Sequence, residues 1–242
     1  MRVAVISDVH SNLHALVAVR REIERARPDE VWNLGDNVGY GAKPSECCRI
    51  LRRLATYSLV GNHDLAAIGK LPLDHFSPVA ATAAAWTKQH LSKSAAAYLA
   101  DLAPLCKLPG CELYHGSPRE AVWAYVLEAS DAKIAFSLSP SPLLLVGHSH
   151  FALAASTKRG RLEFDPAPGG TVIDLSHGRV LLNPGSVGQP RDGDPRAAYL
   201  LLDLEAGRGE FKRVEYDVER TQAEIREAGL PEQLVGRLSR GI

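Results

Sequence analysis

The sequence lacks long apolar runs and net charge, and both absences exclude classes of protein. Its first apolar stretch, residues 3–6, is too short for the core of a signal peptide or for a membrane span. Lysine and arginine together number 28, as do aspartate and glutamate, so no overall positive field attracts a polyanion. We therefore expect a cytoplasmic protein without membrane contact, and nucleic acid is disfavoured as a partner.

Cysteine is also scarce, with four residues in the chain. Cys47 and Cys48 are adjacent, and Cys106 and Cys111 flank a Pro-Gly pair, which is not the spacing of a metal site. We expect reduced structural thiols. The 242 residues, 45% of them hydrophobic, suffice for one buried core. The prediction is a single domain over residues 1–242 with a helical insertion at about 65–104.

Three apolar runs, residues 3–6, 30–34 and 57–60, predict strands with helices between them. This alternation predicts neighbouring parallel strands. The C-terminal ends of such strands form the ligand-binding edge of an open α/β sheet, so side chains that come directly after them converge. The polar segments at these ends are Asp8-Val9-His10, Gly35-Asp36 and Gly61-Asn62-His63-Asp64.

Further histidines come after apolar runs in the second part of the chain. Alanine-rich helices at 79–91 and 94–102, interpreted as packing elements or a substrate-facing cap, precede a hairpin at 105–114. The hairpin leads into His115, and a strand at 143–146 leads into Gly147-His148-Ser149-His150. Short runs between 152 and 216 predict an antiparallel sheet, and helices beginning near 218 and 232 close the chain.

The strand ends provide only oxygen and imidazole donors, and a set of this kind suits Mn²⁺, Fe²⁺ or Fe³⁺, Zn²⁺, Co²⁺ or Ni²⁺ better than Ca²⁺ or Mg²⁺ alone. A single histidine of this kind would ordinarily have a structural role. Seven donors that each follow an apolar strand instead predict a metal centre. Asp36 can hold two divalent ions about 3.5–4 Å apart, because a carboxylate can bind one cation through each oxygen or share one oxygen between the two. The predicted ligands are Asp8, His10, Asp36, Asn62, His115, His148 and His150.

These motifs, in this order, resemble the calcineurin-like metallophosphoesterase superfamily, and within it the small prokaryotic phosphodiesterase branch. There is a looser likeness to diadenosine tetraphosphatases. The resemblance implies an α/β fold, a four-layer αββα sandwich with two mixed β-sheets, in which the β-rich C-terminal part supplies the second sheet. It also implies two metal sites, one held by Asp8, His10, Asp36 and His150, the other by Asp36, Asn62, His115 and His148.

The family likeness assigns roles to residues near these ligands. His63 is the expected catalytic side chain, a proton donor or charge stabiliser outside the metal shell. Asp64 orients it or, alternatively, bonds to nearby backbone as a turn carboxylate. The candidate substrate-binding residues, each with a capping or surface role as the alternative, are Asn12, Asn37, Arg119 and Arg191.

Two further features stay open. The loop at 183–188, Asn-Pro-Gly-Ser-Val-Gly, resembles a family loop whose glycines let the backbone approach the metals, although a plain turn fits the sequence as well. The remaining histidines are predicted to be structural or on the surface: His14, His75, His90 and His177.

The predicted function is hydrolysis of a phosphodiester, of nucleotide type or another small ester, by water that two divalent metals activate. A phosphomonoesterase, acting on a nucleotide or a protein, is the first alternative, and a nuclease is disfavoured by the neutral charge. A non-catalytic scaffold on the same fold, as in retromer-associated relatives, is the second alternative. It is disfavoured because no ligand and no catalytic histidine is missing from the sequence.

Overall fold

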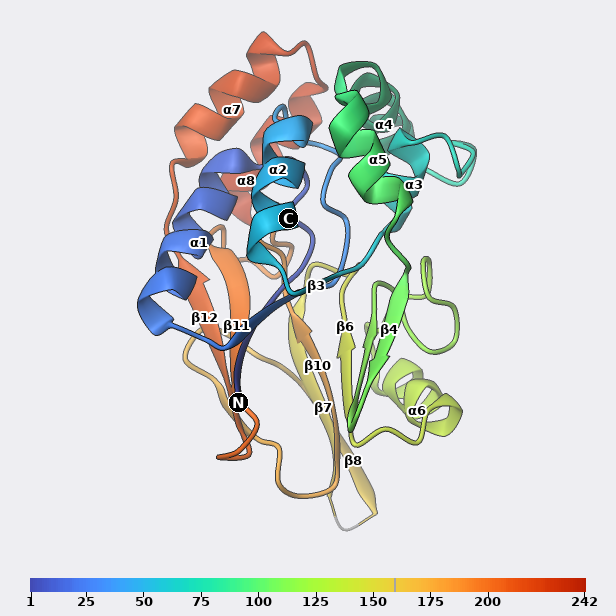
Figure 1. Cartoon of the computed structure of the whole chain (residues 1–242), viewed down its shortest axis with the longest axis vertical. Coiled ribbons are helices and arrows are strands. Elements are labelled where there is room, and N and C mark those ends of the chain that lie inside the picture. Colours follow the sequence, from blue (N-terminus) through green and yellow to red (C-terminus); the bar gives the residue numbers. More distant parts are fainter. Residues whose placement is uncertain (159) are drawn as a thin grey trace.

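The computed structural model describes residues 1–158 and 160–242, which form two facing β-sheets with helices on their outer sides (Figure 1). This is the predicted four-layer αββα sandwich. Every helix in these residues is too short or too polar to cross a bilayer.

The first sheet combines a parallel half with an antiparallel half. Its strands are β1 (Arg2–Ile6), β2 (Glu30–Asn33), β3 (Tyr57–Ser58), β9 (Val172–Asp174), β11 (Ala197–Asp203) and β12 (Arg208–Val214). They lie in the order β3-β2-β1-β11-β12-β9. β1, β2 and β3 are parallel as predicted, with Val5 opposite Trp32, whereas β11 pairs antiparallel with the other edge of β1.

The second sheet is also mixed. Its strands are β4 (Leu105–Leu108), β5 (Cys111–Tyr114), β6 (Leu143–Val146), β7 (Ala152–Lys158), β8 (Arg161–Pro166) and β10 (Arg179–Pro184), in the order β4-β5-β6-β10-β7-β8. The β4–β5 hairpin turns at Pro109-Gly110 as the sequence predicts, and Gly110 has a φ of +74° that suits glycine. β5, β6 and β10 run parallel, so the ends of β5 and β6 point to one edge.

The helices complete the outer layers and one end of the sandwich. They are α1 (Leu13–Ala26), α2 (Pro44–Leu54), α3 (Asn62–Ala67), α4 (Pro78–His90), α5 (Lys93–Ala100), α6 (Ala129–Leu138), α7 (Val218–Glu227) and α8 (Glu232–Arg240). α1 and α2 cover the first sheet and α6 the second, while α3, α4, α5 and α8 gather beyond the C-terminal ends of β1 and β6 (Figure 1).

Three hydrophobic layers hold the sandwich together. The central layer lies between the sheets and includes Val5, Trp32 and Leu145. The outer layers pack α1 and α2 on one sheet and α6 on the other. Because β1 and β6 are buried on both faces, their sequences are continuous apolar runs. The polar residues at their C-terminal ends are therefore held on a rigid support.

The structure corrects the prediction for the C-terminal strands. They do not form one antiparallel second sheet: β9, β11 and β12 complete the first sheet, and β7, β8 and β10 join the second. The reason is that β1 and β6 each have one edge that no earlier strand occupies. β11 pairs with that edge of β1, and β10 pairs with that edge of β6. The sequence analysis also missed α3 and α6, and β3 is shorter than the predicted run of 57–60.

Candidate metal centre

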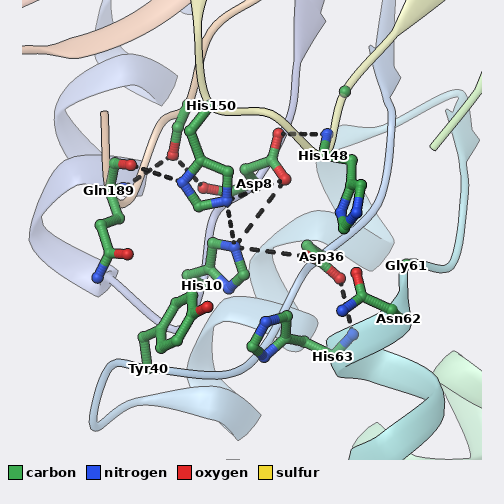
Figure 2. A network of polar contacts seen from close by, with 12 residues as sticks. Asp8, His10, Asp36, Tyr40, Gly61, Asn62, His63, His148, His150 and Gln189 are labelled. Carbon is green, nitrogen blue, oxygen red and sulfur yellow. Dashed lines mark hydrogen bonds and ion pairs between the residues drawn. The ribbon is translucent and has the colours of Figure 1, made fainter. Parts of the chain in front are cut away.

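The seven predicted ligands converge at the C-terminal edge of the two sheets, and most of them sit on a strained backbone. Five have a positive φ between 47° and 64°: Asp8, His10, Asp36, His148 and His150. Non-glycine residues in this left-handed region cost about 1–3 kcal/mol each and persist where the surrounding structure imposes them. The fold therefore uses part of its stability to turn these side chains inward (Figure 2).

Backbone hydrogen bonds tie the strand-end loops to one another. The amide of Asp8 donates to the Gly35 carbonyl at 3.0 Å, and that of His10 donates to the Asp36 carbonyl at 3.0 Å. Across the two sheets, the Gly188 amide donates to the Asp8 carbonyl at 2.9 Å. The loop at 183–188 thus supports the first ligand loop. The approach is close, since a Cβ on Gly188 would collide with the Val9 carbonyl.

Four buried residues form the first ligand group: Asp8, His10, Asp36 and His150. Nε2 of His10 lies 3.0 Å from Nε2 of His150 and 3.4 Å from Oδ2 of Asp36. Nε2 of His150 lies 3.5 Å from Oδ1 of Asp8. These distances place the four donor atoms around one point, as the close view shows (Figure 2).

The second group shares Asp36 with the first. Asp36, His115 and His148 bring their donor atoms within 4.8 Å of one another. Nε2 of His115 lies 3.6 Å from Oδ2 of Asp36 and 3.2 Å from Oδ1 of Asn62. Asn62 therefore completes this group as a fourth neighbour.

Hydrogen bonds to the backbone fix the orientation and the tautomer of three of the four histidines. Nδ1 of His10, His115 and His150 faces the backbone carbonyls of Val38, Leu34 and Gln189, at 3.1, 2.9 and 2.6 Å. Since a carbonyl only accepts, Nδ1 carries the proton and each Nε2 presents a lone pair to the site.

Consequently Nε2 of His10 and Nε2 of His150 face each other as two lone pairs 3.0 Å apart, which is repulsive unless a cation lies between them. Oδ1 of Asp8 and Oδ2 of Asp36 are buried and have no hydrogen-bond partner among the described residues. Unpartnered buried carboxylate oxygens are costly without a compensating charge. The donor set thus fits bound metal ions.

Burial also shifts the pKa values of the aspartates and histidines at the site. Burial raises the pKa of Asp8 to about 7 and that of Asp36 well above its ordinary value. Burial also lowers the pKa of His10, His148 and His150 well below the ordinary range and that of His115 to about 4. The imidazoles are therefore neutral near pH 7, the form that binds metals.

His63 lies beside the ligands without belonging to either group. Its ring centroid is 4.8 Å from that of His10 and 4.4 Å from that of Tyr40, and its Nδ1 has no partner in the described part of the chain. Burial lowers the pKa of His63 to about 3, so the free side chain is a neutral imidazole that can donate one N–H. It lines the cavity, so a bound phosphate could accept that hydrogen bond.

Asp64 does not make a hydrogen bond to the His63 ring in the described residues. Its carboxylate accepts from the backbone amides of Val38 and Gly61, each at 2.9 Å, and from Nδ2 of Asn37 at 2.8 Å. This is the alternative considered for Asp64, a carboxylate bonded to nearby backbone. It fixes the loops that carry Asp36 and Asn62.

Of the four candidate substrate-binding residues, Arg191 alone lines the cavity. Asn12 caps α1 by accepting from the Ala15 amide and donates to the Gly188 carbonyl. Asn37 donates to the Leu59 carbonyl and to Asp64. Arg119 is exposed and lies outside the cavity. Asn12, Asn37 and Arg119 do not line the cavity, and a role for them in substrate binding stays a prediction.

The sequence analysis missed Tyr40, which contacts both Arg191 and His10 at the site. Its hydroxyl accepts a hydrogen bond from Nη2 of Arg191 at 3.3 Å, and its ring packs 4.5 Å from the His10 ring. Tyr40 has a φ of +50° and comes directly after Gly39, where a Cβ would lie 2.7 Å from Nδ1 of His63. The Gly-Tyr-Gly segment shortly after Asp36 was the available signal.

A cavity of about 400 Å³ opens above the ligands. Its floor includes Asp36, His148 and His150, and its walls come from three segments: residues 75–80, residues 123–125 and the C-terminal helix with Arg237. This volume is in the range of small-molecule sites. His75, predicted as a surface residue, is exposed and lies at the rim of this cavity.

Comparisons with known proteins agree with this geometry. Residues 1–207 match the calcineurin-like phosphoesterase superfamily domain. The chain is 37% identical to the uncharacterized protein MJ0912 of Methanocaldococcus jannaschii over 245 residues, 99% of this chain and 98% of the relative. It is similar to the crystal structure of a metallophosphoesterase from Sphaerobacter thermophilus, with a TM-score of 0.91, 45% identity, and coverage of 100% of this chain and 99% of the other.

A more distant structure, the hypothetical protein PH1004 from Pyrococcus horikoshii OT3, shares the fold with a TM-score of 0.82 at 20% identity, and the match covers 100% of this chain and 98% of the other. Together with the α/β sandwich and the buried cluster of aspartates and histidines, these matches identify the chain as a member of the calcineurin-like phosphoesterase superfamily.

Proposed function

We propose that this protein hydrolyses phosphodiesters of small molecules with the help of two divalent metal ions held on either side of Asp36. The observation that carries the proposal is the unpartnered Oδ2 of Asp36, which among the described residues lies 3.4 Å from Nε2 of His10 and 3.6 Å from Nε2 of His115. One carboxylate oxygen thus faces both ligand groups. This arrangement suits a dinuclear hydrolase, in which the two metals lie about 3.5–4 Å apart.

The proposed ligands divide as the two groups do. Asp8, His10, Asp36 and His150 would hold one ion, and Asp36, Asn62, His115 and His148 the other. When bound, two such cations, with Mn²⁺, Fe, Zn²⁺, Co²⁺ and Ni²⁺ as candidates, neutralise phosphoryl charge and make hydroxide available near neutral pH. The donors include two carboxylates and four neutral imidazoles, so they neutralise only part of the charge of two divalent ions. The remaining positive charge attracts an anionic phosphate.

Side chains of the cavity would bind and orient the phosphate. The guanidinium of Arg191 lies over the Tyr40 ring at 5.8 Å from its centroid and is held by the Tyr40 hydroxyl. It therefore presents a positioned positive charge to a phosphoryl oxygen. His63, packed between Tyr40 and Phe76, would donate its N–H to the leaving-group oxygen. A bound phosphate would raise the pKa of His63 from its low value and so favour the imidazolium form, which can transfer a proton to the leaving-group oxygen.

The preference for diesters rests on two features. The family resemblance points to the phosphodiesterase branch, and the cavity of about 400 Å³ is larger than a phosphate alone needs. Phosphomonoester hydrolysis is the alternative within the same chemistry, and a non-catalytic scaffold is the alternative outside it. The complete ligand set disfavours the scaffold.

Hydrolysis assays test the proposal. Protein stripped with a chelator and reloaded with Mn²⁺, Zn²⁺ or Ni²⁺ is assayed on bis-p-nitrophenyl phosphate and p-nitrophenyl phosphate. We expect metal-dependent cleavage that is faster on the diester and absent in Asp36→Asn. Asp101→Asn, an exposed aspartate after α5, is the matched control and should retain full activity. Cleavage of the monoester alone would contradict the diester assignment, and no cleavage of either ester by protein with two bound metals would contradict catalysis.

A further inference from the structure

Three aromatic side chains, Phe76, Trp123 and Tyr125, form a wall on one side of the cavity, here called the aromatic wall. The rings of Phe76 and Trp123 meet edge to face, with centroids 5.0 Å apart and planes at 69°. Tyr125 lies nearly parallel to the ring of His148, with centroids 4.1 Å apart and planes at 12°. The chain is only 6% aromatic, so a group of three at one cavity is a local concentration.

The aromatic wall is only partly buried, although Phe76 packs against the hydrophobic cluster formed by α4, α7 and α8. Tyr125 is 45% exposed, and neither Phe76 nor Trp123 is fully buried. Two separate loops supply the wall: Phe76 precedes α4, and Trp123 and Tyr125 lie between β5 and α6. Hydrogen bonds fix both loops, because the Phe76 amide donates to the Leu73 carbonyl and the Trp123 amide donates to the Glu120 carboxylate. Large apolar surface is thus held at the mouth of a polar site.

The wall lies directly beside the metal ligands and His63. The Phe76 ring centroid is 5.1 Å from that of His63, and the Trp123 centroid is 6.2 Å from that of His148. A group attached to a phosphate at the ligand cluster would therefore reach the wall through one or a few bonds. Arg191 and Arg237, which also line the cavity, provide charges for the phosphate but no complement for an apolar substituent.

We infer that the aromatic wall determines specificity by stacking against a planar aromatic substituent of the phosphoester, either a nucleobase or an aryl ring. This inference rests on the proposed function, since it concerns the substrate of the same site. Aromatic rings attract other planar rings through offset or edge-to-face contacts, beyond simple burial of apolar area. A base stacked on an aromatic side chain typically gains about 5- to 150-fold in affinity.

Calorimetric binding of phosphonates, which cannot be hydrolysed as esters, tests the inference on metal-loaded protein. Phenylphosphonate and cyclohexylphosphonate have rings of similar size, but only phenyl is planar and aromatic. Because cyclohexyl is the more hydrophobic ring, apolar burial alone favours it, whereas stacking favours phenyl. We expect phenylphosphonate to bind about 10-fold more tightly in the wild type.

Substitutions assign this preference to the wall. Trp123→Leu and Phe76→Leu should each reduce the ratio of the two dissociation constants several-fold. Trp86→Leu is the matched control, because Trp86 stacks on His90 at 3.9 Å and does not line the cavity, so its ratio should equal that of the wild type. If the wall only shields the ligands from water, the variants will weaken both phosphonates equally and leave the ratio unchanged, which would overturn the assignment.

A second pair of ligands distinguishes the two sources of an aromatic ring. The phosphonate analogues of thymidine 5′-phosphate and 2-deoxyribose 5-phosphate differ at C1 of the sugar, where the second has a hydroxyl in place of the base. A preference for the base-bearing analogue identifies a nucleotide site, and a preference for phenylphosphonate alone identifies aryl esters. Equal binding within both pairs in the wild type would overturn the inference. Since no hydrolysis is measured, that result is separate from any failure of the esterase assays.

Discussion

The two ligand groups share Asp36 but differ in how firmly the protein holds them. In the first group, Nδ1 of both histidines donates to a carbonyl, and Asp8 accepts from the His148 amide at 3.2 Å. In the second group only His115 is fixed in this way, because neither ring nitrogen of His148 makes a hydrogen bond of normal geometry to a described residue. His148 instead stacks on the half-exposed Tyr125.

This difference indicates a division of labour between the groups. The first group has two carboxylates and two oriented imidazoles, so it should bind its ion more tightly. The second group has one shared carboxylate and an amide oxygen, and its His148 stacks on Tyr125 of the aromatic wall at the cavity. We therefore interpret the first group as the permanent site and the second as the exchangeable one.

Replacement of Asp36, the shared ligand, should impair metal binding by both groups at once. Asp36→Asn leaves both groups without their common carboxylate, and we expect metal content to fall well below two equivalents and kcat/KM to fall by about 10³-fold or more. Elemental analysis and hydrolysis of bis-p-nitrophenyl phosphate measure the two effects. An Asp36→Asn protein that keeps two ions would contradict the shared-ligand assignment.

Substitution in one group at a time should separate the two sites. Asp8→Asn and Asn62→Ala each remove a ligand from one group only, so each variant should lose about one equivalent of metal and about 10²-fold in activity. Circular dichroism before and after reloading provides the control for folding. Loss of both ions from Asn62→Ala, with the first group intact in sequence, would argue against independent sites.

Removal of metal with a chelator should reveal the difference in metal affinity between the two ligand groups. We expect two phases of release, with the second group losing its ion about 10-fold faster because fewer of its ligands are anchored. Asn62→Ala should lack the fast phase and Asp8→Asn the slow one. A single phase in the wild type, unaltered in either variant, would refute the proposed asymmetry.

Removal of the metals should also destabilise the fold, since buried carboxylates and facing imidazole lone pairs are then left uncompensated. Ions that bind the folded state at 100 times their dissociation constant contribute about 2.7 kcal/mol each. Thermal unfolding monitored by circular dichroism should therefore give a lower Tm for stripped protein, and the Tm should return on reloading. An unchanged Tm would mean that the ligand cluster does not bind metal in the folded state.

The smallest effect is expected at Tyr40, which touches the first group from outside. Tyr40→Phe removes the hydroxyl that holds Arg191 and keeps the ring that packs on His10, so KM should rise about 3–10-fold with metal content unchanged. Tyr57→Phe, in β3 and outside the lining of the cavity, is the control. A variant that loses metal would assign Tyr40 to support of the ligands instead of Arg191.

The convergence of the candidate ligands could be predicted because they come directly after buried strands. Apolar runs such as residues 3–6 and 143–146 mark strands directly, and parallel strands bring the residues at their C-terminal ends to one edge. Placing β11 beside β1 could not be predicted in this way. β1 begins at Arg2 and β11 at Ala197, and pairing of such distant strands leaves no local pattern in the sequence.

The cavity walls were less accessible to sequence analysis for the same reason. Tyr40 and Trp123 lie in loops without periodicity, and their roles depend on tertiary contacts with Arg191 and Phe76. For Asn12 and Asn37, the sequence suggested a contact with substrate that the hydrogen bonds of their side chains do not indicate. Both are polar residues beside ligand motifs, yet their side chains are used for capping and for joining loops. Proximity in sequence to a ligand does not establish contact with the substrate.

The most direct test of a dinuclear centre is anomalous diffraction from crystals of the protein loaded with Mn²⁺. We expect two peaks about 3.5–4 Å apart, one on each side of Oδ2 of Asp36, with the lower occupancy between His115 and His148. A single peak between His10 and His150, with nothing on the other side of Asp36 at saturating metal, would show that the site holds one ion and that Asp36 is not a shared ligand.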